Sequence, residues 1–116
     1  MAAKSCPTEE QEQVDLARWL DRSGELWCHV PNGGRRSPRE GARLKRMGVK
    51  AGVPDILIFR EPRNIAVELK RRHGGSVSPV QKKWHKRLLE AGWAVIVAKG
   101  ADEARNLIEN CFQEDT

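Results

Sequence analysis

The spacing of apolar residues changes several times along the chain, and each spacing predicts one kind of secondary structure. Between Thr8 and Gly24 the apolar residues recur every three or four positions, which is typical of an amphipathic helix. Thr8 and Gln11 have the spacing of a capping box, so this helix should begin after Thr8 and stop before Gly24. Its apolar side would consist of Val14, Leu16, Ala17, Trp19 and Leu20.

Four segments rich in apolar and β-branched residues predict strands. Residues 55–59 and 93–98 are nearly continuous apolar runs, and residues 25–30 form a short strand that ends in the turn sequence Pro-Asn-Gly-Gly. Residues 65–70 alternate: the odd positions are apolar, whereas Glu68 and Lys70 fall at even positions. The two sets should therefore face opposite sides of a sheet.

Residues 37–40 and 78–81 have the sequence of a capping box with proline at the first helical position, and each predicts the start of a helix. The first would be short and basic, and Gly48 would end it. The second would be buried through Val80, Trp84, Leu88 and Ala91. A last helix is expected over residues 102–111.

The order of these elements predicts the fold class. Strands joined as a hairpin run antiparallel, whereas a helix between two strands lets them run parallel. The chain is therefore expected to be an α/β protein with a mixed central β-sheet flanked by helices. A chain of 116 residues has the size of one domain, and no linker or repeat divides it. Residues 1–6 and 113–116 are expected to be loose.

The same patterns exclude several classes of protein. The longest apolar runs are far shorter than the roughly 20 residues that cross a bilayer, and we expect no secretory signal. Three cysteines without a CxxC pair fit a reducing compartment better than a disulfide framework or a structural zinc site. We expect a cytoplasmic protein with free thiols and no membrane partner.

The net charge of +5 conceals an uneven distribution along the chain. Residues 35–87 carry +12, whereas residues 1–34 carry −3 and residues 88–116 carry −4. A strongly basic segment between acidic ends attracts a polyanion such as nucleic acid. The alternative is a solvated basic surface that serves only solubility.

Two of the four acidic residues of this basic segment fall at the ends of predicted strands. Asp55 begins one strand, and Glu68 and Lys70 end its hairpin partner. Strand pairing can bring the carboxylates together, where they repel unless one is protonated or a cation lies between them. Mg²⁺ or Mn²⁺ suits such oxygen ligands, and a nearby lysine can orient or deprotonate a water molecule. This is the equipment for metal-assisted phosphodiester hydrolysis.

The residues around this group closely resemble the virus-type replication-repair nuclease (VRR-NUC) family of the PD-(D/E)xK superfamily. The resemblance is carried by Lys-Ala-Gly-Val-Pro-Asp at 50–55, Glu-Leu-Lys at 68–70 and Gly-Ser-Val-Ser-Pro-Val-Gln at 75–81. The turn at 31–34, the stretch at 42–48 and the first helix are similar to small stand-alone, phage-type members, so the likeness covers residues 8–108.

The resemblance implies a restriction-endonuclease-like fold and a Mg²⁺- or Mn²⁺-dependent endonuclease that acts on branched or otherwise structured DNA. Stand-alone members resemble Holliday-junction resolvases, so a homodimer is expected, with two sites that nick two strands of a symmetric junction. A phage or prophage protein in the cytoplasm of a bacterial host is the origin that the resemblance suggests.

The resemblance also assigns roles to residues. Asp55 and Glu68 would bind the metal ion, the backbone carbonyl of Leu69 would complete its ligands, and Lys70 would activate water or stabilise the phosphate. The plain alternatives are that Asp55 caps a turn and that Glu68 and Lys70 form a surface ion pair.

Two further residues match the family less specifically. Gln81 would contact the phosphate or the attacking water, unless it only closes the capping box. Glu9 would be the family's first-helix glutamate at the metal site, although Glu10 and Glu12 are close by. A glutamate there can also simply stabilise the helix dipole. None of the histidines, at positions 29, 73 and 85, has metal-ligand spacing.

DNA binding is expected to depend mainly on contacts to phosphates, with little reading of base sequence. Residues 35–50 alone carry seven basic groups against one acidic group. The residues expected to contact DNA are Asn32, Arg35, Arg36, Arg39, Arg43, Lys45, Arg46, Lys50, Arg71, Arg72 and Ser78.

Three other functions compete with the branched-DNA nuclease. A non-catalytic nucleic-acid-binding module would keep the basic surface without turnover. A nuclease for RNA or for linear duplex ends would share the chemistry but not the substrate. A purely structural interaction protein would not respond to Mg²⁺.

Overall fold

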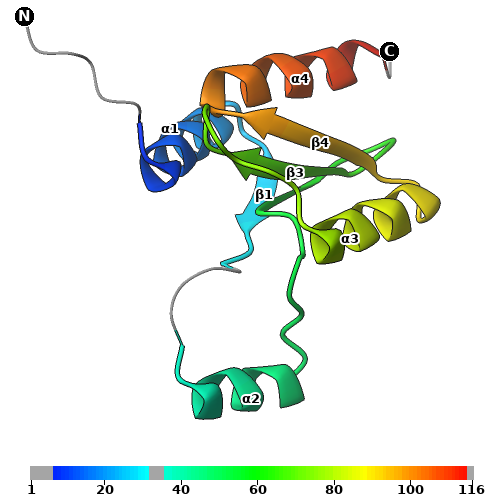
Figure 1. Cartoon of the computed structure of the whole chain (residues 1–116). Helices are drawn as coiled ribbons and strands as arrows, with labels where there is room; N and C mark the ends of the chain where they lie inside the picture. Colours follow the sequence, from blue (N-terminus) through cyan, green and yellow to red (C-terminus); the bar gives the residue numbers. More distant parts are fainter. Residues whose placement is uncertain (1–6, 32–35, 115–116) are drawn as a thin grey trace, which may run out of the picture.

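The computed structural model of the chain describes residues 7–31 and 36–114, with side chains as far as Cys111. Within these residues, four helices and four strands follow one another in the expected order (Figure 1). They are α1 (Glu9–Arg22), β1 (Leu26–His29), α2 (Pro38–Arg46), β2 (Ile56–Phe59), β3 (Ile65–Lys70), α3 (Pro79–Glu90), β4 (Ala94–Lys99) and α4 (Ala101–Glu114).

The strands form one mixed sheet in the order β1-β2-β3-β4. β1 pairs with β2 and β2 with β3 antiparallel, whereas β3 and β4 are parallel. A short turn joins β2 to β3, and α3 makes the longer crossover that a parallel pair requires. The sheet confirms the predicted α/β class. In the β2–β3 register Ile56 faces Val67, so Asp55 falls beside the end of β3.

One face of the sheet packs against α1 and α4 (Figure 1). The core there consists of Leu16, Leu20, Ile56, Ile58, Ile65, Val67, Leu69, Ile96, Ala98, Ala101, Ala104 and Ile108. Burial of each large aliphatic side chain stabilises the fold by about 1.5–3 kcal/mol. The core therefore holds β2 and β3, the two strands that carry the candidate chemistry, in a fixed position.

The capping boxes of α1 and α3 form as predicted. Thr8 accepts a hydrogen bond from the Gln11 backbone, and the Gln11 side chain accepts one from the Thr8 backbone. Ser78 and Gln81 make the same pair of bonds at α3. At α2, Ser37 caps the helix, but the Glu40 carboxylate binds Arg43 rather than the cap.

Three positions expected on the apolar faces of helices are exposed instead. Val80 and Ala91 of α3 are exposed, whereas Gln81, Trp84, His85 and Leu88 are partly buried. α3 packs against β4, and the contacts of Gln81 and His85 with Glu68 of β3 favour this rotation of the helix. In α1, Val14 is 44% exposed and Glu12 takes a buried place instead.

α2 lies apart from the sheet (Figure 1). None of its residues is buried, and Met47 at its C-cap is 69% exposed. Gly48 follows with a φ of 106°, a left-handed conformation that ends the helix as predicted. The basic helix is thus presented to solvent on almost all sides.

Several expectations concern the chain ends and the turn after β1. Residues 113 and 114 belong to the last turn of α4, and the looseness of residues 113–116 stays a prediction. Residues 1–6, 115–116 and 32–35 lie outside the described residues, and with them the predicted contacts of Asn32 and Arg35. In the described parts of the chain, no helix is both long and apolar enough to cross a membrane. The cytoplasmic location stays a prediction.

Candidate active site

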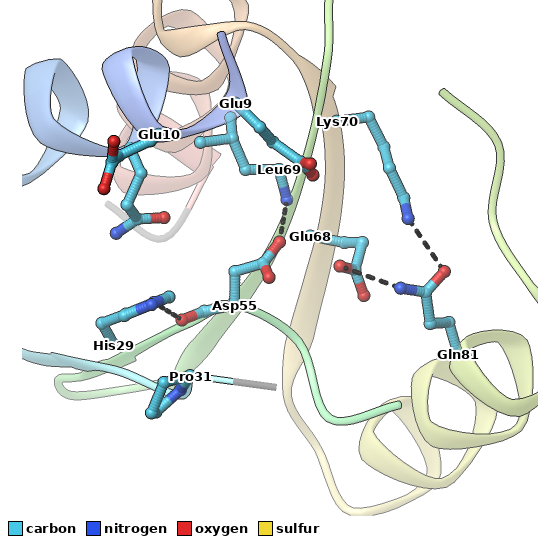
Figure 2. A pocket seen from close by; sticks show the side chains of 10 residues that line it. Glu9, Glu10, His29, Pro31, Asp55, Glu68, Leu69, Lys70 and Gln81 are labelled. Atoms are coloured by element: carbon cyan, nitrogen blue, oxygen red, sulfur yellow. Dashed lines mark hydrogen bonds between the residues drawn. The ribbon is translucent and has the colours of Figure 1, made fainter. Parts of the chain in front are cut away.

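A pocket of about 540 Å³ opens where the ends of β2 and β3 meet the first turns of α1 and α3 (Figure 2). Its lining combines acidic, basic and amide side chains: Glu9, Glu10, Gln13, His29, Pro31, Asp55, Glu68, Leu69, Lys70 and Gln81. The sequence-predicted residues from four separate elements therefore converge on one concave surface.

Asp55 is held against the edge of β3. Its Oδ2 accepts a hydrogen bond from the Leu69 backbone N–H at 2.7 Å. Because β2 begins at Ile56, the backbone of that strand does not pair with this N–H. The N–H and C=O of one residue in a strand point to the same neighbour, so the Leu69 carbonyl faces the Asp55 side as well. The Nδ1 atom of His29 lies 2.8 Å from the Asp55 carbonyl oxygen and fixes the backbone there.

Glu68 is the most deeply buried acidic group of the site, with 1% of its surface exposed. Burial, a hydrogen bond to Asp55 and the charge of Asp55 raise the pKa of Glu68 to about 8, and Lys70 opposes this increase. Two carboxyl groups this close do not both ionise readily without a cation between them. The surface ion pair considered for Glu68 and Lys70 is therefore not what forms.

Gln81 joins α3 to both charged residues of β3. Its Oε1 accepts from Lys70 Nζ at 2.9 Å and from the Ser78 backbone at 2.8 Å, and its Nε2 donates to Glu68 Oε2 at 3.4 Å (Figure 2). Gln81 thus closes the capping box and also contacts both charged residues, whereas its predicted contact with the phosphate or the attacking water stays a prediction. Gly75 lets the loop between β3 and α3 pass close to Lys70, because a Cβ at position 75 would lie 3.0 Å from the Lys70 Cβ.

His85 is a site residue that the sequence did not reveal. Its Nε2 lies 3.2 Å from Glu68 Oε1, and its side chain is 12% exposed. Burial, then the charge of Lys70, lower the pKa of His85, so it acts as a neutral hydrogen-bond partner rather than as a cation. The available signal was its spacing of four residues from Gln81, which places both on one helix face.

The three glutamates of α1 separate in the structure. The Glu9 side chain reaches toward Leu69 and Lys70, whereas that of Glu10 points away from Glu68 (Figure 2). Glu12 is buried at 2% exposure and accepts hydrogen bonds from Arg72 at 3.0 and 3.3 Å, outside the pocket. The geometry favours Glu9 among the three, and its role at a metal ion stays a prediction.

The donor atoms of the pocket are suited to a hard divalent cation. Asp55, Glu68 and the Leu69 carbonyl are oxygen donors, which Mg²⁺ and Mn²⁺ prefer, and burial together with the neighbouring Asp55 raises the pKa of Glu68. Among the described residues, no group of three or more His, Cys, Asp or Glu side chains is arranged to hold a metal. A bound ion would therefore keep several water ligands, as Mg²⁺ commonly does.

The residues predicted to bind DNA divide into three groups. Arg36, Arg39, Lys45, Arg46, Lys50 and Arg71 are exposed, and of these Arg36 donates a hydrogen bond to the Pro31 carbonyl oxygen at 3.2 Å. Arg43, Arg72 and Ser78 already have partners: Glu40 binds Arg43, Glu12 and Asp102 bind Arg72, and Ser78 caps α3. Their contacts with DNA stay predictions, as do those of Asn32 and Arg35, which lie outside the described residues.

Comparisons with known proteins agree with this geometry. The family model of the VRR-NUC domain matches residues 7–102. A solved structure described as a VRR_NUC domain protein is 29% identical, with a TM-score of 0.70, and the match covers 92% of this chain and 89% of that chain. A second, described as a VRR_NUC domain, is 22% identical, with a TM-score of 0.61, over 87% of this chain and 94% of that chain. No curated protein matches.

The family match spans most of the chain, and it includes Asp55, Glu68 and Lys70 at the positions where the pocket brings them together. The protein thus belongs to the VRR-NUC family, a family of nucleases of the PD-(D/E)xK type.

Proposed function

We propose that this protein is a Mg²⁺- or Mn²⁺-dependent DNA endonuclease that hydrolyses phosphodiester bonds in branched DNA, as a Holliday-junction resolvase does. One observation carries the proposal: Asp55, Glu68 and Lys70 converge in one pocket, and the pKa of Glu68 is raised to about 8 there. A purely structural ion pair between Glu68 and Lys70 would not explain why the Asp55 carboxyl group lies beside that of Glu68.

Asp55, Glu68 and the Leu69 carbonyl would hold the metal ion. When bound, such an ion polarises the phosphate and lowers the pKa of a coordinated water molecule. Glu68 must lose its proton to bind the metal ion. Gln81 Nε2 and His85 Nε2 are placed to hold the ionised carboxylate in one orientation.

Lys70 is the group placed to act on the substrate. The amide oxygen of Gln81 holds Lys70 Nζ at the pocket surface, 2.9 Å away. From there the lysine can orient the attacking water or donate hydrogen bonds to the phosphate as negative charge develops on it. Preorganisation by Gln81 reduces the entropy that a flexible lysine side chain would lose.

The distribution of charge supports recognition by shape rather than by sequence. Many of the exposed cations lie on α2, in the segment before β2 and on the outer face of α3, where they can contact phosphates but carry no pattern for base edges. A homodimer would place two such surfaces and two pockets on a symmetric junction. We include this dimer in the proposal.

The test is cleavage of a panel of labelled substrates at one salt concentration: four-way junction, flap, linear duplex and RNA, each with Mg²⁺, Mn²⁺, Ca²⁺ or EDTA. We expect cleavage of the branched DNAs with Mg²⁺ and Mn²⁺, and binding without efficient cleavage in Ca²⁺. Preferred cleavage of linear duplex or of RNA would replace the proposed substrate. No cleavage of any substrate would favour a binding module.

A further inference from the structure

A second groove, of about 490 Å³, lies on the side of α3 next to the catalytic pocket. It is lined by Lys50 and Ala51 from the segment before β2 and by Val80, Lys83, Trp84 and Arg87 from α3. These four helix residues have the spacing i, i+3, i+4 and i+7 and so form one stripe along the helix. The catalytic pocket takes Gln81 from the neighbouring stripe.

The groove is a built feature of the fold. Gly52 has a φ of 88°, and a Cβ at this position would lie 2.9 Å from the Val80 carbonyl oxygen. Only glycine therefore lets the segment before β2 approach the first turn of α3 so closely. This contact fixes the distance between the two walls of the groove.

The lining combines an apolar surface with positive charge. Trp84 is partly buried and Val80 is 45% exposed, so both present apolar surface to the groove. Around them lie Lys50, Lys83 and Arg87, and within the described parts of the chain no ion pair joins these three side chains to an acidic residue. Among the residues that the structure describes, no carboxylate lines the groove. This composition fits a ligand with a flat apolar part and negative charges.

The groove is also close to the proposed cleavage site. Gln81 and Trp84 are three residues apart, which is about 4.5 Å along the helix axis. Successive nucleotides of one strand rise by about 3.4 Å in duplex DNA and lie farther apart where they are unstacked. A strand with a phosphate in the catalytic pocket can thus place its next one or two nucleotides at the groove.

We propose that this groove binds an unpaired DNA nucleotide beside the cleaved phosphodiester, with its base against Trp84 and its phosphates near Lys50, Lys83 and Arg87. The inference rests on the proposed function and adds a feature of the substrate. In a duplex, both faces of each base are covered by neighbouring bases, so only an unpaired base can stack on a tryptophan. The groove would therefore favour branched DNA with single-stranded nucleotides over fully paired duplex.

The first experiment measures binding of the full chain to two fluorescent DNAs of equal length, a fork with unpaired arms and a fully paired duplex, in EDTA to prevent cleavage. Trp84→Leu should weaken binding of the fork about tenfold and leave duplex binding unchanged, because stacking is lost while apolar volume is kept. Trp84→Phe should retain most of the affinity. Equal losses for both DNAs, or no loss for either, would overturn the proposal.

A second pair of variants keeps the test decisive if Trp84→Leu folds poorly. Lys83→Ala with Arg87→Ala removes two cations from the groove, and Lys82→Ala with Lys86→Ala removes two exposed cations from another side of the same helix. The groove pair should lose several-fold more affinity for the fork than the control pair. Equal losses would contradict the groove as a site.

The outcomes also separate the groove from the proposed function. Cleavage of the fork in Mg²⁺ tests the nuclease, whereas fork binding in EDTA tests the groove. Cleavage without any dependence of binding on Trp84 would reject only the groove. An RNA fork that alone shows the dependence on Trp84 would reject the assignment to DNA.

Discussion

α2 and the catalytic pocket differ in almost every physical property, although both belong to the basic middle of the chain. α2 has no buried residue and stands away from the sheet, with four basic residues against one acidic residue. The pocket lies at the end of a strand whose residues are buried from Ile65 to Leu69. If the proposed function is correct, attraction of DNA and hydrolysis of DNA would reside in separate parts of the molecule, so substitutions should affect one without the other.

The largest effect is expected at Lys70. Lys70→Met should lower the cleavage rate by about 10²–10⁴-fold, because water orientation and phosphate stabilisation are lost, while DNA affinity stays near that of the wild type. Single-turnover cleavage and equilibrium binding measure the two quantities. Lys82→Met, which removes an exposed lysine from α3, is the control and should leave cleavage nearly unchanged. Equal losses of binding and cleavage in Lys70→Met would show that the lysine only attracts DNA.

The raised pKa of Glu68 predicts an unusual dependence of stability on pH. Its pKa is about 8 in the folded protein against an ordinary 4.5, so the folded protein retains a proton that the unfolded chain releases. The bound proton therefore stabilises the folded protein, and this stabilisation is fully present below pH 4.5. It is lost as pH rises through 8, so the free energy of unfolding falls by on the order of a few kcal/mol in EDTA. Denaturant unfolding from pH 5 to 9 measures it.

Glu68→Gln isolates that effect, because the variant keeps the shape of the side chain without a titrating group. Its stability should change less with pH than that of the wild type. Mg²⁺ should raise the melting temperature of the wild type more at pH 8 than at pH 6, since the ion must displace the proton. A wild type that gains stability from pH 5 to 8 relative to Glu68→Gln would contradict the burial of a protonated carboxyl group.

A smaller effect is expected at His85, which holds the Glu68 carboxylate from α3. His85→Phe should weaken Mn²⁺ binding about tenfold, the size usual for residues that orient a metal ligand. His85→Gln, which restores a donor, should recover part of the loss. Calorimetric titration with Mn²⁺ measures the affinity, and Lys86→Gln is the neighbouring control. Unchanged affinity in His85→Phe would show that the contact with Glu68 is incidental.

The smallest effect is expected on α2. Lys45→Ala with Arg46→Ala removes two exposed cations, so DNA affinity should fall several-fold and the slope of log affinity against log salt should decrease by about 2. Cleavage at saturating DNA should be unchanged. Arg18→Ala with Arg22→Ala on α1 is the control. A loss of cleavage at saturation would show that α2 also shapes the catalytic pocket.

Much of the fold could be predicted because local signals agreed with the final structure. The capping residues Thr8 and Ser78 and the left-handed Gly48 mark helix ends through short-range hydrogen bonds and backbone geometry. The strand pattern around Asp55 and Glu68 likewise brought the two carboxyl groups together, since an antiparallel hairpin leaves few alternative registers.

The rotation of α3 could not be predicted from its sequence. Apolar periodicity placed Val80 inside, but hydrogen bonds from Gln81 and His85 to Glu68 hold the polar stripe of the helix against β3 instead. These bonds cross 13 and 17 residues of sequence, and a pattern within one helix does not contain them. The burial of Glu12 could not be predicted for the same reason, because its partner Arg72 lies 60 residues away in the sequence.

The most direct measurement of the central claim is Mg²⁺-dependent cleavage of a labelled four-way junction by the wild type and by Asp55→Asn under single-turnover conditions. Asp55→Asn keeps an acceptor for the Leu69 N–H and removes one charge from the metal site. The account predicts cleavage by the wild type that EDTA abolishes, and a loss of at least about a hundredfold in Asp55→Asn with junction binding retained. Equal cleavage by both proteins, or cleavage that persists in EDTA, would contradict it.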